Sequence, residues 1–355
     1  MKFYTKILLS ILLTVTVIFA FTGISCTLTP QGIQVLSGDY TCPKLVSFNL
    51  TSENDALVSF SRPVEFEKLS ISSSSSTSGT SSTNGTNETE EISVKSTAIS
   101  EGTYLLTFEN DLDCRNLYTL EGNVKDLHGN TLYFKDTFQG YNSRIPEIRL
   151  NEIRTEYTKP KCEFIELLVL SDGNLGGMEL LSAVDGKEKS YIFPPVEVKS
   201  GEYVVVHFRK IEDGEIDELE DDCTVSGGTE AGSWRDLWVE NTSARIGKSD
   251  VILLRERIDG PIVDCVLFAE STTSSWKNDF VAECAKEAFE SGKWESSSGS
   301  DYSPSCAVCS DGLTVTRTLS RIGDGNSAQD WIVVASSNCT LGYENSKKAY
   351  SSVTK

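Results

Sequence analysis

Cysteine and histidine side chains are the groups in this 355-residue chain best suited to nucleophilic, redox or zinc chemistry. The chain has ten cysteines but only two histidines, His128 and His207. His128 follows a turn-forming aspartate, so we expect an exposed loop side chain there rather than a catalytic one. Cys306 and Cys309 form a single CxxC. Because no second CxxC or nearby histidine pair accompanies it, a structural disulfide is favoured over a zinc or redox site.

Acidic side chains are the other candidates for chemistry. The chain has 32 Lys and Arg against 52 Asp and Glu, a formal net charge of −20, so no nucleic-acid partner is expected. Residues 211–222 hold eight acids and no base, which suits a hard cation such as calcium. The run lacks the order of an EF-hand loop, however, and a solvated loop is the more usual outcome. Apart from calcium no cofactor is expected, and its weak candidates are Asp213, Asp217, Asp221, Asp324, Asn326 and Asp330.

Glu152 and Glu166 fall on two neighbouring predicted strands. Paired carboxylates can share a proton and serve as general acid and base. We expect a structural role for this pair, because no G-x-S-x-G, P-loop, H-E-x-x-H or Cys-His nucleophile motif accompanies it. The sequence therefore predicts no catalytic residue and a protein that is not an enzyme.

The N-terminus has the order of an export signal. Lys2 and Lys6 precede residues 7–21, which carry no charge and are too short for a comfortable membrane span. Gly23-Ile24-Ser25-Cys26 then resembles a bacterial lipobox. The resemblance implies that residues 1–25 are a lipoprotein-type signal peptide, that diacylglycerol on Cys26 anchors the chain to a membrane, and that residues 26–41 are a tether.

Export changes how the other cysteines are interpreted, because disulfides persist in oxidising compartments. With Cys26 lipidated, nine cysteines remain, so at least one stays unpaired. Cys162 is the one left out of our predicted set. The disulfide candidates are Cys42, Cys114, Cys223, Cys265, Cys284, Cys306, Cys309 and Cys339.

The elements that would position these groups are mostly strands. Segments such as residues 56–60 and 147–153 alternate apolar and polar residues, residues 102–108 and 201–208 are further strand candidates, and only residues 279–291 show a weak helical period. We predict an all-β chain of two tandem Ig-like antiparallel β-sandwiches with polar insertions. The predicted ranges are a first sandwich over 42–145 with a flexible Ser/Thr-rich insertion near 70–91, a second sandwich over 146–346 with insertions near 211–242 and 269–314, and a tail over 347–355.

The first sandwich resembles the bacterial Ig-like domains of S-layer and surface proteins. The resemblance is carried by an early strand ending in proline, a tyrosine strand and an Asp-x-x-Gly-Asn turn. These are Val58-Ser59-Phe60-Ser61-Arg62-Pro63-Val64, Tyr118-Thr119-Leu120 and Asp126-Leu127-His128-Gly129-Asn130.

The second sandwich resembles the lamin-tail domain, an Ig-like sandwich that also occurs in exported bacterial proteins. The resemblance implies structural roles for Glu152 and Glu166 and core or latch positions for Arg321 and Trp331. It rests on Leu150-Asn151-Glu152-Ile153, Phe164-Ile165-Glu166-Leu167, Gly177-Met178-Glu179-Leu180, Tyr191-Ile192-Phe193-Pro194, Ser200-Gly201-Glu202-Tyr203, Ser249-Asp250-Val251-Ile252, Leu319-Ser320-Arg321, Asp330-Trp331 and Thr340-Leu341-Gly342 with Asn345.

Together these patterns predict a lipid-anchored protein of the bacterial cell envelope, at the outer membrane or cell surface rather than the periplasmic face of the inner membrane. We expect a non-catalytic binding, structural or adhesion module whose partner is an envelope or host macromolecule, because function in such scaffolds usually lies on the loops. The alternative is an accessory or calcium-dependent hydrolase, nuclease-like in type, because lamin-tail domains also accompany exported hydrolases.

Overall fold

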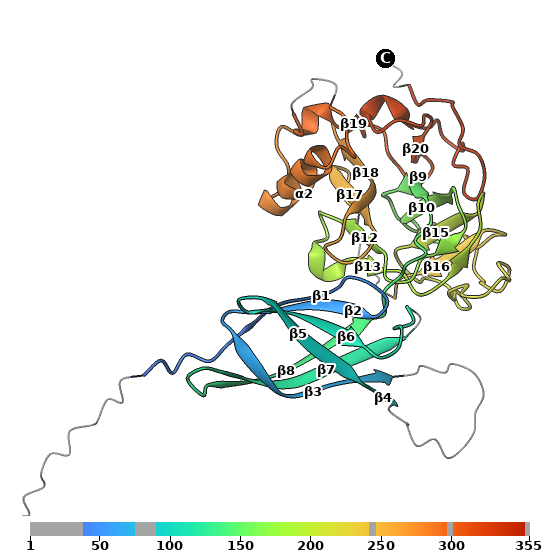
Figure 1. Cartoon of the computed structure of the whole chain (residues 1–355). Helices are drawn as coiled ribbons and strands as arrows, with labels where there is room; N and C mark the ends of the chain where they lie inside the picture. Colours follow the sequence, from blue (N-terminus) through green and yellow to red (C-terminus); the bar gives the residue numbers. More distant parts are fainter. Residues whose placement is uncertain (1–37, 75–89, 115, 241–245, 297–300, 352–355) are drawn as a thin grey trace, which may run out of the picture. The chain divides into compact units, whose positions relative to one another are not determined.

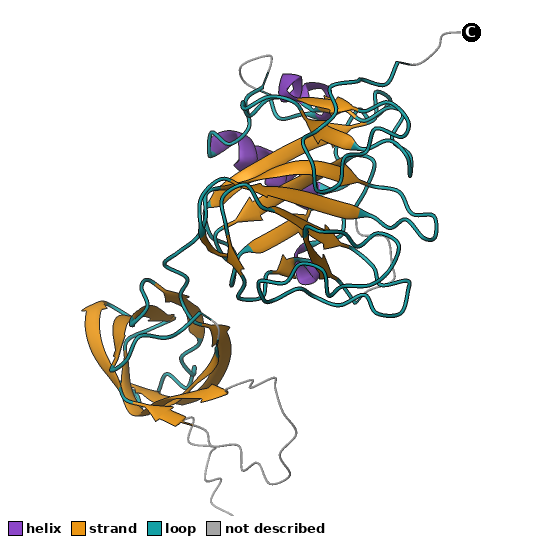
Figure 2. Ribbon diagram, turned by 90° about the vertical axis from the view of Figure 1, so that its right-hand side faces the viewer, coloured by secondary structure: helices purple, strands orange, loops and turns teal. Residues whose placement is uncertain are grey.

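Strands make up nearly all of the regular structure in the computed structural model of the chain (Figures 1 and 2). The structure describes residues 38–74, 90–114, 116–240, 246–296 and 301–351. The chain divides into two units, Met1–Thr41 and Cys42–Lys355. The predicted signal peptide and Cys26 lie outside the described residues. Within the described residues, no helix is long and apolar enough to cross a membrane.

Two antiparallel four-stranded sheets enclose the first hydrophobic core. Their strand orders are β1-β2-β6-β5 and β4-β3-β7-β8. Alternate residues of β7 point inward, among them the buried Tyr118, Leu120 and Val124, as the period of two predicts. The strands are β1 (Leu45–Leu50), β2 (Asp55–Phe60), β3 (Val64–Ser74), β4 (Glu90–Ile92), β5 (Val94–Ser100), β6 (Thr103–Phe108), β7 (Leu117–Asp126) and β8 (Thr131–Gln139).

The Ser/Thr-rich insertion is shorter than the sequence suggested. Strand β3 continues through Ser74, and its residue Ile71 pairs with Ile92 of β4. The prediction of a flexible segment is therefore wrong for residues 70–74 and 90–91, because residues 70–74 of β3 pair with β7 and residues 90–91 of β4 pair with β3. Residues 75–89 lie outside the described part of the chain.

The second hydrophobic core is formed by a six-stranded sheet, β16-β15-β10-β9-β20-β21, and a five-stranded sheet, β13-β12-β17-β18-β19. Their pairs are antiparallel except β15 with β16 and β18 with β19. The strands of these two sheets are β9 (Ile148–Arg154), β10 (Phe164–Val169), β12 (Glu179–Ser182), β13 (Tyr191–Ile192), β15 (Tyr203–His207), β16 (Arg235–Trp238), β17 (Asp250–Arg255), β18 (Ile262–Ala269), β19 (Val308–Cys309), β20 (Leu319–Arg321) and β21 (Trp331–Val333). The strands β11 (Gly173–Asn174) and β14 (Glu197–Val198) form a separate two-stranded antiparallel sheet.

Helical structure in the described residues consists of one α-helix and three single 3₁₀ turns. Helix α2 (Asp279–Glu290) confirms the weak helical period. The side chain of Asn278 caps its first turn by accepting from Val281 N at 3.0 Å. Its buried face packs near β17 and β18. The 3₁₀ turns are η1 (Lys187–Lys189), η2 (Pro304–Cys306) and η3 (Ala328–Asp330).

The prediction of an all-β fold built from antiparallel sheets is confirmed. Two separate clusters of buried apolar side chains accompany these sheets, one over residues 56–134 and one over residues 148–333. The β7–β8 turn is also as expected, because Asp126 Oδ1 accepts from His128 N and Asn130 N at 2.9 Å each and His128 is exposed. The exact domain boundaries stay predictions.

Candidate functional site

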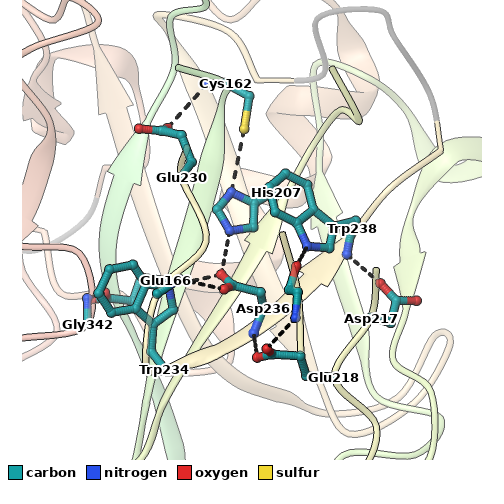
Figure 3. Close-up of polar contacts among 12 residues, drawn as sticks. Cys162, Glu166, His207, Asp217, Glu218, Glu230, Trp234, Asp236, Trp238 and Gly342 are labelled. Atoms are coloured by element: carbon teal, nitrogen blue, oxygen red, sulfur yellow. Dashed lines mark hydrogen bonds and ion pairs between the residues drawn. The ribbon is translucent and has the colours of Figure 1, made fainter. Parts of the chain in front are cut away.

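Three buried polar side chains, Cys162, His207 and Asp236, lie in contact with one another beside strands β10, β15 and β16. His207 Nδ1 lies 3.5 Å from Cys162 Sγ, and His207 Nε2 lies 2.7 Å from Asp236 Oδ1 (Figure 3). The parallel pairing of β15 with β16 brings His207 and Asp236 together, because it places their strands side by side. Each of the three residues has an exposed fraction of 0%.

This connectivity is that of a nucleophile, a base and a group that orients the base. The environment of Cys162 opposes that chemistry. Burial, and then the nearby Glu230 carboxylate, raises the pKa of the Cys162 thiol well above its ordinary value. The His207 ring is stacked on the indole of Trp238, with centroids 3.9 Å apart and planes 11° apart. The three residues therefore form an internal hydrogen-bonded chain with a protonated thiol, closed off from solvent.

Asp236 holds this chain in place. Besides His207, its carboxylate accepts from Trp234 Nε1 at 2.9 Å (Figure 3). It also accepts from Gly232 N at 3.0 Å. A buried carboxylate needs such donors to compensate for lost hydration. The carboxylate therefore fixes the position of both the imidazole and the Trp234 ring.

The Trp234 ring is enclosed by two glycines. A Cβ added to Gly342 would lie 1.9 Å from this ring, and one added to Gly232 would lie 2.3 Å from it. Gly342 also has φ +77°, in the left-handed region that favours glycine. Only glycine therefore fits at residue 342, where the C-terminal segment passes over the ring.

Part of the acidic insertion, by which we mean residues 211–222, covers strand β16. Glu218 Oε2 accepts from Asp236 N at 2.8 Å, and Asp217 Oδ1 accepts from Trp238 N at 2.6 Å (Figure 3). In return, Glu218 N donates to Asp236 O at 3.0 Å. These bonds occupy backbone groups of an edge strand that would otherwise stay open to another chain. Burial raises the pKa of both carboxyl groups. The prediction of a solvated loop is thus wrong for these acids.

The structure places Glu152 and Glu166 opposite each other on β9 and β10. Burial, and then the neighbouring Glu152, raises the pKa of Glu166 to about 8. Both carboxylates bind residues 340–345, which we call the C-terminal strap. Glu152 Oε2 accepts from Thr340 N at 3.0 Å, and Glu166 Oε2 accepts from Gly342 N at 2.5 Å. The pair therefore secures the strap to the sheet.

The expected latch positions join the same network. Arg321 donates to Asp264 Oδ2 at 2.7 Å and to Leu150 O at 2.8 Å, and its guanidinium lies 4.7 Å from the centroid of the Trp331 ring. Asn345 of the strap donates to Arg321 O at 2.9 Å. These contacts tie the strap, β9, β18 and β20 together through one buried arginine.

The calcium candidates are not brought together. Asp330 accepts from Ser327 N at 3.0 Å and caps η3, whereas Asp324 pairs with Arg149 at 2.5 Å. Asp221 lies 3.8 Å from Lys199, Asp213 is exposed, and the backbone carbonyl of Asn326 accepts from Glu295 N at 2.7 Å. Among the described residues, no three histidine, cysteine or acidic side chains are arranged to hold a metal ion.

The structure does not show the predicted disulfides, because all nine described cysteines are thiols. Two thiols of the second sandwich illustrate how they are engaged. Cys265 Sγ donates to Lys293 O at 3.2 Å, and Cys339 Sγ accepts from Arg154 Nη2 at 3.4 Å. Burial raises the pKa of Cys284 to about 12 and that of Cys339 to about 11. These thiols act as small apolar or weakly polar packing groups.

Comparison with known proteins gives a family for most of the second sandwich. Residues 146–333 match the family described as TP_1001_2nd, protein second domain. The chain belongs to this family. The matched span contains Cys162, His207 and Asp236, the Glu152 and Glu166 pair, and Arg321, but ends before the strap.

An uncharacterized protein of Treponema pallidum (strain Nichols) is 30% identical over 184 residues, which cover 49% of this chain and 47% of that protein. The chain thus spans about half the length of this relative.

Two solved structures are more distant. The N-terminal part of the bacterial S-layer protein SbsC matches with a TM-score of 0.22 and 18% identity, over 40% of this chain and 35% of that one. A DUF4785 family protein from Legionella pneumophila matches with a TM-score of 0.21 and 10% identity, over 63% and 55% of the two chains. Neither likeness carries an argument about the fold.

Proposed function

We propose that the chain is an exported, lipid-anchored protein of the bacterial cell envelope that acts as a non-catalytic binding or structural module. Export and anchoring are supported by the charged start, the apolar run and the lipobox-like Gly23-Ile24-Ser25-Cys26. Acyl chains on Cys26 would bury many methylene groups, each contributing about 0.8 kcal/mol. The membrane would then be a partner through the lipid alone.

One observation carries the non-catalytic part of the proposal. The only described array with nucleophile, base and orienting group, Cys162 with His207 and Asp236, has an exposed fraction of 0% at each residue. The carboxylate pair is likewise engaged, because Glu152 and Glu166 bind the C-terminal strap. The reactive side chains of the second sandwich thus hold the fold, which leaves recognition to its loops.

We further propose that the second sandwich is of the lamin-tail type. The residues that carry that resemblance are scattered over the sequence, and Asn151 and Asn345 are 194 positions apart. In the structure, Asn345 donates to Asn151 Oδ1 at 3.0 Å and to Arg321 O at 2.9 Å. Their convergence in one network supports the resemblance.

The anchor is tested by replacing Cys26 with alanine in the full chain. We expect the parent protein in the membrane fraction and Cys26→Ala in the fraction released after export, because the thioether-linked lipid is lost. Cell fractionation with immunodetection measures this. Cys42→Ala is the matched control, since it removes an exposed cysteine outside the lipobox. Retention of Cys26→Ala on the membrane would contradict the anchor.

A thiol hydrolase is the second candidate, favoured by the order of contacts from Cys162 through His207 to Asp236. Mapping of iodoacetamide-labelled thiols by mass spectrometry distinguishes the two functions. We expect the native chain to be labelled at the exposed Cys42 and Cys309, and at Cys162 at least about 100-fold more slowly, because only an accessible thiolate reacts. In guanidinium all three should react alike. Native labelling of Cys162 as fast as Cys309 would reject the non-catalytic proposal.

A further inference from the structure

A pocket of about 340 Å³ lies beside the buried Cys162 array, near the end of β9. Its walls come from four separate parts of the chain. Arg154 ends β9 and Lys161 follows in the segment before β10, Glu230 and Trp234 precede β16, Thr316 precedes β20, and Ser337 belongs to the segment that leads into the C-terminal strap. The pocket is large enough for a ligand of about one sugar ring.

The charges at this pocket do not cancel. The guanidinium of Arg154 is already engaged by protein groups, because it forms an ion pair with Glu230 and donates to Cys162 O at 3.2 Å and to Cys339 Sγ at 3.4 Å. Lys161 is half-buried, and its ammonium has no ion pair or hydrogen bond among the described residues. One positive charge therefore remains at the pocket in a chain whose net charge is −20.

The other residues that line the pocket suit a compact ligand that carries hydroxyl groups. The hydroxyl-bearing residues Thr316 and Ser337 also line the pocket, and Ser337 N donates to Thr316 O at 3.1 Å, which joins the two segments. Ser337 has φ 63°, an uncommon value outside glycine that often marks functional loops. Trp234 is fixed between Gly232 and Gly342 and so presents a rigid aromatic edge. Aromatic and hydroxyl groups of this kind recognise sugars.

We propose that this pocket binds a small acidic sugar through its carboxylate, which pairs with the ammonium of Lys161. A free amino acid fits less well, because its ammonium would need an acidic partner and Glu230 is already bound by Arg154. The inference deepens the proposed binding role by naming a ligand class, and it does not depend on the lipid anchor.

The test uses the purified full chain with D-glucuronate, D-glucose and L-glutamate as probes, followed by titration calorimetry. Glucuronate should bind at least about tenfold more tightly than glucose or glutamate, and more weakly as salt rises, because an ion pair carries the difference. Lys161→Met should reduce glucuronate affinity to that for glucose, whereas Lys161→Arg should retain most of it. Lys135→Met, at an exposed position on β8, is the matched control and should bind like the parent.

Equal affinity for glucuronate and glucose, tighter binding of glutamate, or an unchanged glucuronate affinity in Lys161→Met would overturn the proposal. So would the absence of glucuronate binding at about 10 mM. Thermal melting of each variant confirms that the fold is kept. Because membrane fractionation of Cys26→Ala has a separate readout, failure of the ligand assignment is distinguishable from failure of the anchoring proposal.

Discussion

Replacing Arg321 with methionine is expected to lower the free energy of unfolding by about 3–5 kcal/mol, the usual cost of leaving one partner of a buried ion pair alone. The side chains of Arg321 and Asp264 are only 3% and 8% exposed. Without the guanidinium, the Asp264 charge stays buried and Leu150 O loses a donor at 2.8 Å. Urea unfolding followed by tryptophan fluorescence measures the change.

A double-mutant cycle sharpens this prediction. Asp264→Leu combined with Arg321→Met should cost less than the sum of the single changes, because no unpaired charge remains. Some cost should persist, since Leu150 N also donates to Asp264 Oδ2 at 2.7 Å. Arg149→Met is the control and should cost less than about 1 kcal/mol, because its partner Asp324 is 90% exposed. If Arg321→Met proved as mild as Arg149→Met, the latch would contribute little to stability.

The second large effect is a loss of stability as the pH rises. Burial and the neighbouring Glu152 raise the pKa of Glu166 to about 8 in the folded chain, from an ordinary value of 4.5. The folded state therefore binds this proton more tightly than the unfolded state. The stability that it contributes is fully present below pH 4.5 and is lost as the pH rises towards 8, with a slope of at most about 1.4 kcal/mol per pH unit.

Unfolding free energies measured between pH 6 and 8 test this effect, and Glu166→Gln should flatten the slope there because it removes the titrating group. Asp250→Asn is the control. Burial raises the pKa of Asp250 to about 6, so this change should flatten the slope mainly below pH 6. A slope between pH 6 and 8 that survives in Glu166→Gln would show that another group is responsible.

Local patterns predicted the strands well, because inward and outward positions alternate along them. Residues 103–108 illustrate this, because every second side chain is buried. Residues 279–290 form the helix that the weak helical period predicts. The Cys162 array could not be foreseen, since its members are separated by 45 and 29 positions and meet only through the pairing of β15 with its neighbours. A sequence motif with short spacing cannot indicate a contact between residues so far apart in the chain.

The acidic insertion shows a different limit of sequence reasoning. Eight acids without a base are typical of a solvated loop, and nothing in the run marks Asp217 and Glu218 as distinct. Their role depends on β16, an edge strand whose amide groups need acceptors. The predicted disulfides, which are absent from the described residues, show a similar limit. A disulfide requires two cysteines at a suitable distance and orientation, which the number of cysteines does not reveal.

The C-terminal strap also bears on the order in which the chain folds. Thr340 and Gly342 bind Glu152 and Glu166 across 188 and 176 positions of sequence. Contacts of such long range form late, because a large loop must close before they stabilise the structure. Glu152 and Glu166 of the six-stranded sheet therefore lack these donors until residues 340–342 have been synthesised. If the chain is exported, as proposed above, and crosses the membrane unfolded, this sheet would stay incomplete until residues 340–345 had also crossed the membrane.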